Sequence, residues 1–119
     1  MKTILVADDE LGIRDLYSDT FKEAGYNVLL AKTGAECLDL VSKNTVDLII
    51  LDIHLPDING MLLLEKLSKE LDKKAPPVIL NSAHAGYESN SKAWLAEQYL
   101  VKSGNLDELK ETVNKIVNR

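Results

Sequence analysis

Residues 5–10 read LVADDE, an apolar run that stops at three consecutive acids. The apolar residues belong to a predicted strand over residues 2–7, KTILVA. Apolar positions then recur at spacings of three and four from Ile13 to Ala24, which predicts a helix closed by Gly25. This part of the chain therefore reads as a buried strand, an acidic turn and a helix.

The same unit repeats along the chain. Strands are predicted over residues 27–31, 47–51, 78–81 and 99–101, and helices over 33–44, around 61–67, within 86–97 and over 107–118. Strands that are continuously apolar and alternate with helices indicate a parallel sheet covered on both faces. Because a closed barrel needs eight such units, five predict an α/β doubly wound three-layer sandwich with flavodoxin-like (βα)5 strand order 2-1-3-4-5.

Composition limits the classes of function. The chain has 119 residues, so residues 1–119 are expected to form a single domain. Its formal net charge of −5 disfavours direct binding to nucleic acid. Cys37 is the only cysteine, which fits a reducing compartment, and no apolar run approaches membrane-spanning length. We expect a cytoplasmic protein that does not contact the membrane.

Acids follow two strands that are neighbours in this strand order. Asp8 and Asp9 follow the first strand, and Asp52 follows the third. In open α/β sheets, ligands bind beyond the carboxyl ends of the strands where the order reverses, so the three carboxylates should converge there. Crowded carboxylates need a compensating cation, and oxygen ligands of this kind suit Mg²⁺, with Mn²⁺ as an alternative.

The next two strands end in other reactive groups. Ser82 follows VILN and offers a hydroxyl, and Lys102 follows YLV and offers an ammonium group. A metal site, a carboxylate nucleophile, a hydroxyl and a lysine together indicate phosphoryl transfer, which depends mainly on positioning and on neutralising charge.

These residues carry a resemblance to a known family. VADDE, the segment LDIHLPDINGM with Asp52, Pro56 and Gly60, the pair Ser82-Ala83, and Tyr99 three residues before Lys102 are similar to the receiver domains of two-component response regulators of the chemotaxis-regulator kind. The resemblance covers essentially the whole chain. It implies a domain that takes a phosphoryl group from a sensor histidine kinase, a phosphotransfer protein or a small phosphodonor, and that catalyses only its own phosphorylation and dephosphorylation.

The resemblance also implies a role for each site residue. Asp52 would be the phosphoacceptor and form an aspartyl phosphate. Asp9 and Asp52 would bind Mg²⁺ directly, Asp8 would act through water, and the backbone carbonyl of His54 would add a further ligand. Lys102 would pair with the phosphoryl oxygens.

A switch is implied as well. Ser82 would move to hydrogen-bond the phosphoryl group, and Tyr99 would swing into the space that Ser82 leaves. That movement would change the surface formed by the helix within 86–97, the strand 99–101 and the last helix.

One feature departs from the family pattern, and two histidines are expected to modulate the reaction. The family usually follows its lysine with a proline in a cis peptide bond, and here Ser103 stands in that place; we expect the cis bond to be retained at a cost of about 3 to 4 kcal/mol. His54 and His84 lie two residues after Asp52 and Ser82, and we expect them to modulate the lifetime of the phosphorylated state. A zinc site built from both histidines and the carboxylates is the alternative.

Other functions remain open at this point. A small phosphohydrolase with an aspartyl nucleophile would need a second acid two residues after Asp52, where His54 stands. A flavodoxin-like nucleotide module would need a phosphate-binding loop in place of the acids. A receiver that docks without being phosphorylated is a further alternative. The downstream partner could be a separate protein, a C-terminal output domain or a second copy in a phosphorylation-dependent dimer.

Overall fold

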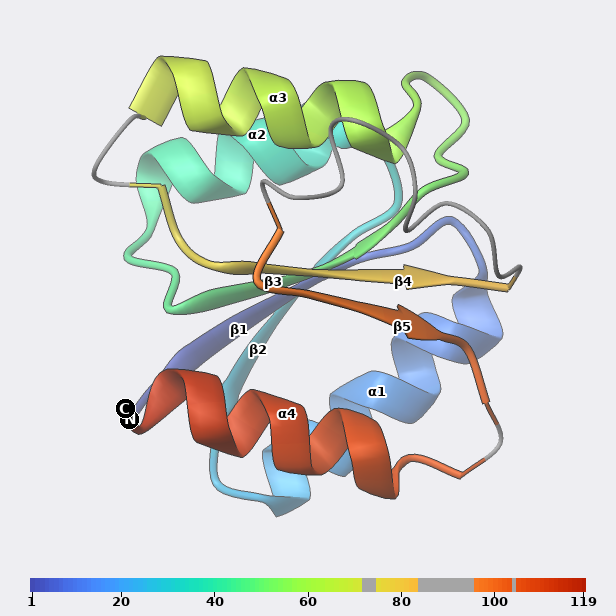
Figure 1. Ribbon diagram of the computed structural model, residues 1–119, viewed down its shortest axis with the longest axis vertical. Helices are drawn as coiled ribbons and strands as arrows, with labels where there is room; N and C mark the ends of the chain where they lie inside the picture. The colour runs from blue at the N-terminus through green and yellow to red at the C-terminus, as the bar shows by residue number, and fades with distance from the viewer. Residues whose placement is uncertain (72–74, 84–95, 104) are drawn as a thin grey trace.

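One parallel sheet organises the protein. The computed structural model describes residues 1–71, 75–83, 96–103 and 105–119. Its strands are Thr3–Ala7 (β1), Asn27–Ala31 (β2), Leu48–Asp52 (β3), Val78–Ser82 (β4) and Gln98–Val101 (β5). They pair in the order β2-β1-β3-β4-β5, with every neighbouring pair parallel (Figure 1). The predicted strand order is confirmed.

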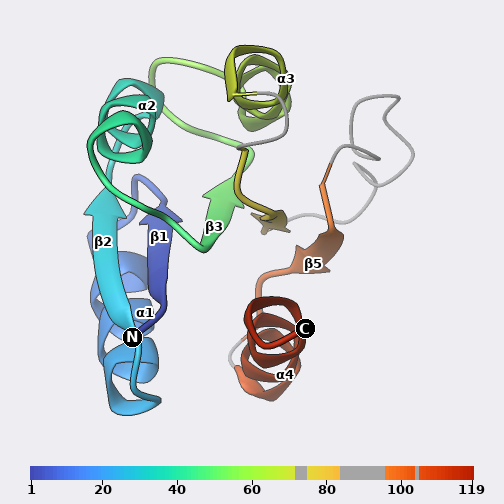
Figure 2. The same cartoon turned by 90° about the vertical axis from the view of Figure 1, so that its left-hand side faces the viewer.

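Helices cover both faces of the sheet. The described helices are Leu11–Glu23 (α1), Gly34–Lys43 (α2), Gly60–Leu71 (α3) and Asp107–Val117 (α4). Seen along the sheet, α2 and α3 lie on one side, and α1 and α4 lie on the other (Figure 2). The three-layer sandwich is therefore confirmed. The helix predicted within 86–97, which would contain Ala93 and Trp94, falls mainly on residues 84–95, outside the described part of the chain.

The central strand β1 explains why the strands read as continuously apolar. Leu5 and Ala7 belong to the core on the α2–α3 side, whereas Ile4 and Val6 belong to the core on the α1–α4 side. All four residues have no exposed surface. A strand that is buried on both faces needs apolar residues at every position, because successive side chains point to opposite faces.

Two predicted helix boundaries are also observed. The Thr33 hydroxyl accepts a hydrogen bond of 3.1 Å from the backbone N–H of Glu36 and so caps the start of α2. At the end of α1, Gly25 has a φ of 94° and donates its N–H to the carbonyl of Lys22. A positive φ is favourable for glycine, which has no Cβ to collide with the backbone.

Strands β3 and β4 each run one residue further than their apolar patterns predicted. Asp52 pairs in register with Asn81, and Ser82 pairs with Val101. Polar side chains mark the end of an apolar run, but the backbone ladder continues through them. The last residue of each strand is thus a polar group held firmly at the carboxyl edge of the sheet. No helix among the described residues is long and apolar enough to cross a membrane.

Candidate functional site

One lysine and two aspartates meet at the carboxyl edge of the sheet. The ammonium nitrogen of Lys102, just after β5, lies 2.8 Å from Oδ2 of Asp8 and 3.6 Å from Oδ2 of Asp52. The side chains are nearly buried, with exposed fractions of 11% for Lys102, 3% for Asp8 and 5% for Asp52. Lys102 also lies 3.8 Å from the exposed carboxylate of Glu10. The structure therefore brings together residues from three strand ends, as expected from the strand order.

The charges of Asp8, Asp52 and Lys102 affect the pKa values of Asp52 and Lys102. Burial raises the pKa of Asp52, and the negative charge of Asp8 raises it further, although the positive charge of Lys102 acts in the opposite direction. Burial disfavours the charged form of Lys102, but the hydrogen bond and charge of Asp8, together with the charges of Asp52 and Glu10, outweigh burial, so the pKa of Lys102 is raised. Lys102 is therefore a firmly protonated cation beside a carboxylate that is less acidic than usual.

The acidic turn forms a compact cluster of carboxylates. One carboxylate oxygen from each of Asp8, Asp9 and Glu10 lies within 4.8 Å of the others. Asp8 is buried, while Asp9 and Glu10 are exposed. Among the described residues this cluster does not include Asp52, which faces Lys102 instead. Glu10 is thus an additional acid at the site, one that the sequence interpretation quoted but gave no role.

Backbone contacts hold the ends of the strands in place. The N–H of Asp8 donates to the carbonyl of Ala31 at 3.0 Å, and the Arg14 side chain donates to the carbonyl of Asp8 at 2.8 Å. On the other side, the N–H of Lys102 donates to the carbonyl of Ser82 at 2.6 Å. Asp8 and Lys102 are therefore positioned by the sheet ladder itself, which is rigid compared with a free loop.

The peptide bond after Lys102 corrects one expectation. No peptide bond among the described residues is cis, so the bond between Lys102 and Ser103 is trans. Serine has no ring to weaken the trans preference, and the cis form would cost about 3 to 4 kcal/mol. Lys102 nevertheless reaches both Asp8 and Asp52. The trans bond does not aim the lysine away from the acids.

The loop after β3 folds back beside Asp52. The backbone N–H of His54 donates to the Asp52 carboxylate, and the N–H of Gly60 donates to the carbonyl of Ile53 at 2.6 Å. His54 and Asn59 form an isolated antiparallel bridge, and the Asn59 side chain accepts a hydrogen bond of 2.7 Å from the N–H of Met61 at the start of α3. The residues after Asp52 are thus held by a short closed turn.

Asp57 ties this turn to α2, which the sequence interpretation missed. Its carboxylate accepts hydrogen bonds from the N–H groups of Gly34 at 2.8 Å and Ala35 at 3.0 Å. These two bonds lower the pKa of Asp57, because they stabilise the ionised form. Gly34 allows this approach, since a Cβ at that position would collide with the side chain of Ile58. No sequence signal pointed to this contact, because Asp57 lies 22 to 23 residues from the N–H groups whose hydrogen bonds it accepts.

Ser82 and Tyr99 lie on the same face of the sheet. Val78 and Leu80 belong to the α2–α3 core, and Ser82, two residues further along the same strand, points to that side as well. Tyr99 packs against the same core and is half-buried. Since Ser82 pairs with Val101, the serine and the tyrosine are offset by two residues on neighbouring strands.

Of His54 and His84, the structure describes only His54. His54 is exposed, and its backbone contacts Asp52. His84 lies outside the described residues. Of the two histidines in the zinc alternative, the described residues include His54 alone.

A buried hydrogen bond near the site was also missed. The Asn81 side-chain nitrogen donates to the Tyr17 hydroxyl at 2.7 Å, and each residue is 2% exposed. Tyr17 lies within the predicted helix from Ile13 to Ala24, and Asn81 ends the predicted strand over residues 78–81. A polar residue ending such a strand and a tyrosine on a buried helix face were the available signals, because both need partners when buried.

Comparison with known proteins gives the family. The sequence pattern of the response regulator receiver domain matches residues 4–114. The chain belongs to this family. As a receiver domain it is a phosphoacceptor of two-component signalling. Sporulation initiation phosphotransferase F of Bacillus subtilis is 31% identical over 113 residues, which are 94% of this chain and 90% of that protein. The polar-differentiation response regulator DivK of Brucella ovis is 30% identical over 112 residues, 92% of this chain and 90% of DivK.

Solved structures of receiver domains agree with this fold. The response regulator TrrA of Thermotoga maritima, in complex with Mg²⁺-BeF, is 42% identical with a TM-score of 0.91, covering 98% of this chain and 99% of that one. A chain in the complex of histidine kinase ThkA with TrrA is also 42% identical, with a TM-score of 0.89 and coverage of 98% of each chain. The receiver domain is thus similar to one that has been observed with a kinase.

Proposed function

We propose that this receiver domain, taken as one unit over residues 1–119, accepts a phosphoryl group on Asp52. The observation that carries the proposal is the Lys102 ammonium, which lies between the buried carboxylates of Asp8 and Asp52 at the carboxyl edge of the sheet. A carboxylate nucleophile with a buried cation beside it is suited to an incoming group that carries negative charge. Asp52 also ends the strand β3, so its position is set by the sheet rather than by a loop.

The reaction is a group transfer to a carboxylate oxygen. An Asp52 oxygen forms a bond to phosphorus while the bond from phosphorus to the donor breaks, and the donor leaves with that electron pair. The donor is a phosphohistidine of a sensor histidine kinase or phosphotransfer protein, or a small acyl phosphate. Lys102 offsets the negative charge of the phosphoryl oxygens, and the Ser82 hydroxyl donates a hydrogen bond to one of them. The domain catalyses only its own phosphorylation and dephosphorylation.

The acidic turn fits a divalent metal. Asp8, Asp9 and Asp52, with the backbone carbonyl of His54, would hold Mg²⁺, and Glu10 lies close enough to contribute. All of these donors are oxygens, which suits Mg²⁺, or Mn²⁺ as an alternative, better than zinc or copper. When bound, the metal supplies positive charge for the phosphoryl oxygens. The Mg²⁺-BeF complex of TrrA, a receiver 42% identical to this one, supports the assignment.

Ser82 and Tyr99 are proposed as the switch. They lie on the same face of neighbouring strands, so a movement of Ser82 toward the phosphoryl group changes the space beside Tyr99. The phosphoryl group favours the arrangement in which Ser82 contacts it, and the population shifts accordingly. A coupling of about 1 to 3 kcal/mol is typical of such switches. The surface that changes includes β5 and α4.

His54 and His84 are proposed to set the lifetime of the phosphorylated state. His54 is exposed next to Asp52, where its side chain can influence the approach of water to the acyl phosphate. Replacing His54 by Asn and His84 by Glu should change the dephosphorylation rate. An unchanged rate in both single variants would contradict this role.

The partners follow from the reaction. The phosphoryl group comes from a histidine kinase or phosphotransfer protein, consistent with the complex of ThkA and TrrA. The signal passes to a downstream protein, a C-terminal output domain or a second phosphorylated copy. Direct binding to nucleic acid is not proposed, because the net charge is −5. We propose a cytoplasmic location, where the free thiol of Cys37 stays reduced.

The test is intact-mass analysis after incubation with Mg²⁺ and acetyl phosphate. We expect a gain of one phosphoryl group that hydroxylamine removes, and no gain for Asp52→Asn or in the presence of a chelator. No gain with acetyl phosphate or with any histidine kinase would favour a receiver that docks without phosphorylation. Continuous release of phosphate from many substrates would favour a phosphohydrolase.

A further inference from the structure

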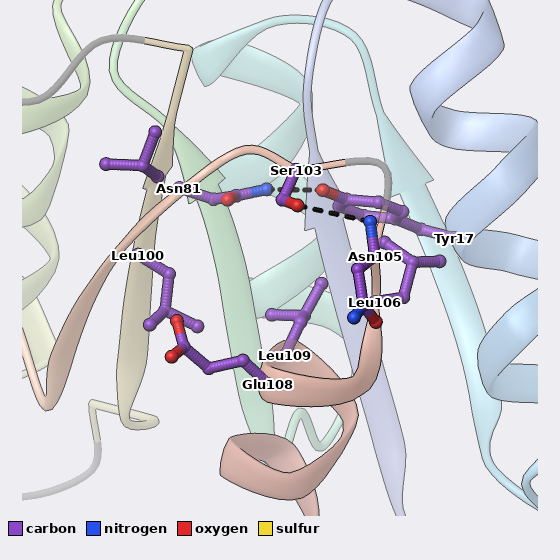
Figure 3. A pocket seen from close by; sticks show the side chains of 9 residues that line it. Tyr17, Asn81, Leu100, Ser103, Asn105, Leu106, Glu108 and Leu109 are labelled. Carbon is purple, nitrogen blue, oxygen red and sulfur yellow. Dashed lines mark hydrogen bonds between the residues drawn. The ribbon is translucent and has the colours of Figure 1, made fainter.

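The Tyr17–Asn81 pair is a buried polar contact on the α1–α4 side of the sheet. It joins α1 to β4 through a hydrogen bond of 2.7 Å between residues that lie 64 positions apart (Figure 3). Ile79 on the same strand and Phe21 on the same helix belong to the core on this side. A buried amide or hydroxyl without a partner is costly, so each group depends on the other.

Register places this pair beside Asp52. Asn81 is the register partner of Asp52, and paired residues of parallel strands point to the same face at a strand separation of about 4.8 Å. The phenol of Tyr17 is close enough to Lys102, Asp8 and Asp52 to be influenced by their charges, while burial raises its pKa and keeps it neutral. The pair therefore flanks the acids on the α1 side.

A cavity adjoins the pair, and Asp52 does not line it. It has a volume of about 190 Å³. Asn81 and Tyr17 line it together with side chains of α4 and of the segment before α4 (Figure 3). Because Asn81 is buried but lines this cavity, packing alone does not determine the orientation of its amide. The hydrogen bond that Asn81 donates to the Tyr17 hydroxyl is the directional contact that does.

We propose that Tyr17 and Asn81 are positioning residues for phosphoryl acceptance, and that their hydrogen bond holds the Asn81 amide against Asp52 and keeps it from rotating into the cavity. This inference rests on the proposed function of Asp52. Neither residue touches the phosphoryl group. Without the hydrogen bond, Asn81 turns toward the cavity, and the Asp52 carboxylate and the Lys102 ammonium lose a fixed neighbour. Misplacement of reacting groups by about 1 Å can slow a reaction by up to about 100-fold.

The test separates positioning from stability. Tyr17→Phe and Asn81→Leu each leave a buried partner unpaired, and the double variant removes both polar groups. We expect both single variants to lose stability and the double variant to recover much of it. The rate of phosphorylation at saturating acetyl phosphate should fall by about 10-fold or more in all three, including the double variant, with little change in the half-saturating concentration.

Val113→Ala is the matched control. Val113 is buried in the same core but does not line the cavity. It should lose stability while the folded protein keeps its phosphorylation rate. If the double variant recovers both stability and rate, the pair is merely structural and the inference is wrong.

The inference and the proposed function fail in different ways. If the wild type takes no phosphoryl group, the proposed function fails. The backbone amide NMR resonances of Asp52 and Lys102 in the unphosphorylated protein then decide the inference. We expect them to shift in the double variant and to stay in place in Val113→Ala, whereas resonances unchanged in the double variant would overturn it.

Discussion

The ammonium nitrogen of Lys102 lies 2.8 Å from Oδ2 of Asp8 and 3.6 Å from Oδ2 of Asp52, so one nearly buried cation offsets the charge of two nearly buried carboxylates. The contacts come from three different strand ends, and none of the three side chains is more than 11% exposed. In such a setting, removing the cation leaves two acids without compensation, which costs far more than losing a surface ion pair.

Lys102→Met should destabilise the protein by roughly 3 kcal/mol at pH 7 in the absence of divalent metal. Urea unfolding measures the change. Lys69→Met is the control, because Lys69 pairs with Glu65 at 3.1 Å on an exposed helix face with 75% of its side chain exposed. Similar losses of stability in the two variants would contradict the proposed role of Lys102 in holding the acids.

Mg²⁺ should stabilise the wild type against unfolding, because a ligand that binds only the native state adds stability. At a concentration of about 100 times the dissociation constant the gain is about 2.7 kcal/mol. Asp9→Asn should reduce this gain, since Asp9 is an exposed member of the acidic cluster. Asp19→Asn, an exposed acid on α1, should leave it unchanged. An equal response to Mg²⁺ in both variants would argue against a metal at the acidic turn.

Asp52→Asn should stabilise the metal-free protein at pH 7. Burial and the charge of Asp8 raise the pKa of Asp52 in the native state, so the native state binds more protons than the unfolded state above about pH 3.9. The free energy of unfolding of the wild type therefore falls as pH rises from about 3.9 through the native pKa of Asp52. Unfolding curves in a chelator should show the advantage of Asp52→Asn shrinking as pH falls through the raised native pKa toward about 4, with little further change below that. A stability difference between Asp52→Asn and the wild type that grows toward low pH would contradict the raised pKa of Asp52.

Gly60→Ala should disturb the turn after Asp52. A Cβ at this position would collide with the carbonyl oxygen of Asp52 and lie 2.7 Å from Cα of Ile53, which are backbone atoms that cannot rotate away. We expect a loss of about 1 to 3 kcal/mol, together with slower phosphorylation. Gly12→Ala in α1 is the matched substitution, with nothing within 4 Å of the new Cβ, and should gain about 0.5 to 1 kcal/mol. Two variants of equal stability would contradict this account of the turn.

The architecture and the meeting of three candidate residues at one edge could be predicted from the sequence, because each rests on a local pattern. Apolar runs and helical spacing predicted the strands and their order, and the order alone placed Asp8, Asp52 and Lys102 at one edge. The strand ends were less accurate, since Asp52 and Ser82 continue the backbone ladder after the apolar pattern has stopped.

What could not be predicted depends on side chains that meet only in the folded chain. Asp57 caps a helix 22 to 23 residues before it, and Tyr17 meets Asn81 across 64 residues. Neither contact has a spacing rule, because each depends on how the layers pack. The expected cis bond before Ser103 was carried over from the family's proline, and serine does not share the weak trans preference that makes it favourable.

The central claim is that Asp52 is the phosphoacceptor, and the most direct measurement identifies the phosphorylated residue itself. Borohydride reduces an acyl phosphate of aspartate to homoserine, so peptide mass mapping after treatment with acetyl phosphate, Mg²⁺ and borohydride reads the position. We predict homoserine at position 52, absent when metal is chelated, with Asp8 and Asp9 unchanged. Homoserine at another aspartate, or a phosphorylated protein in which position 52 remains aspartate, would contradict the account.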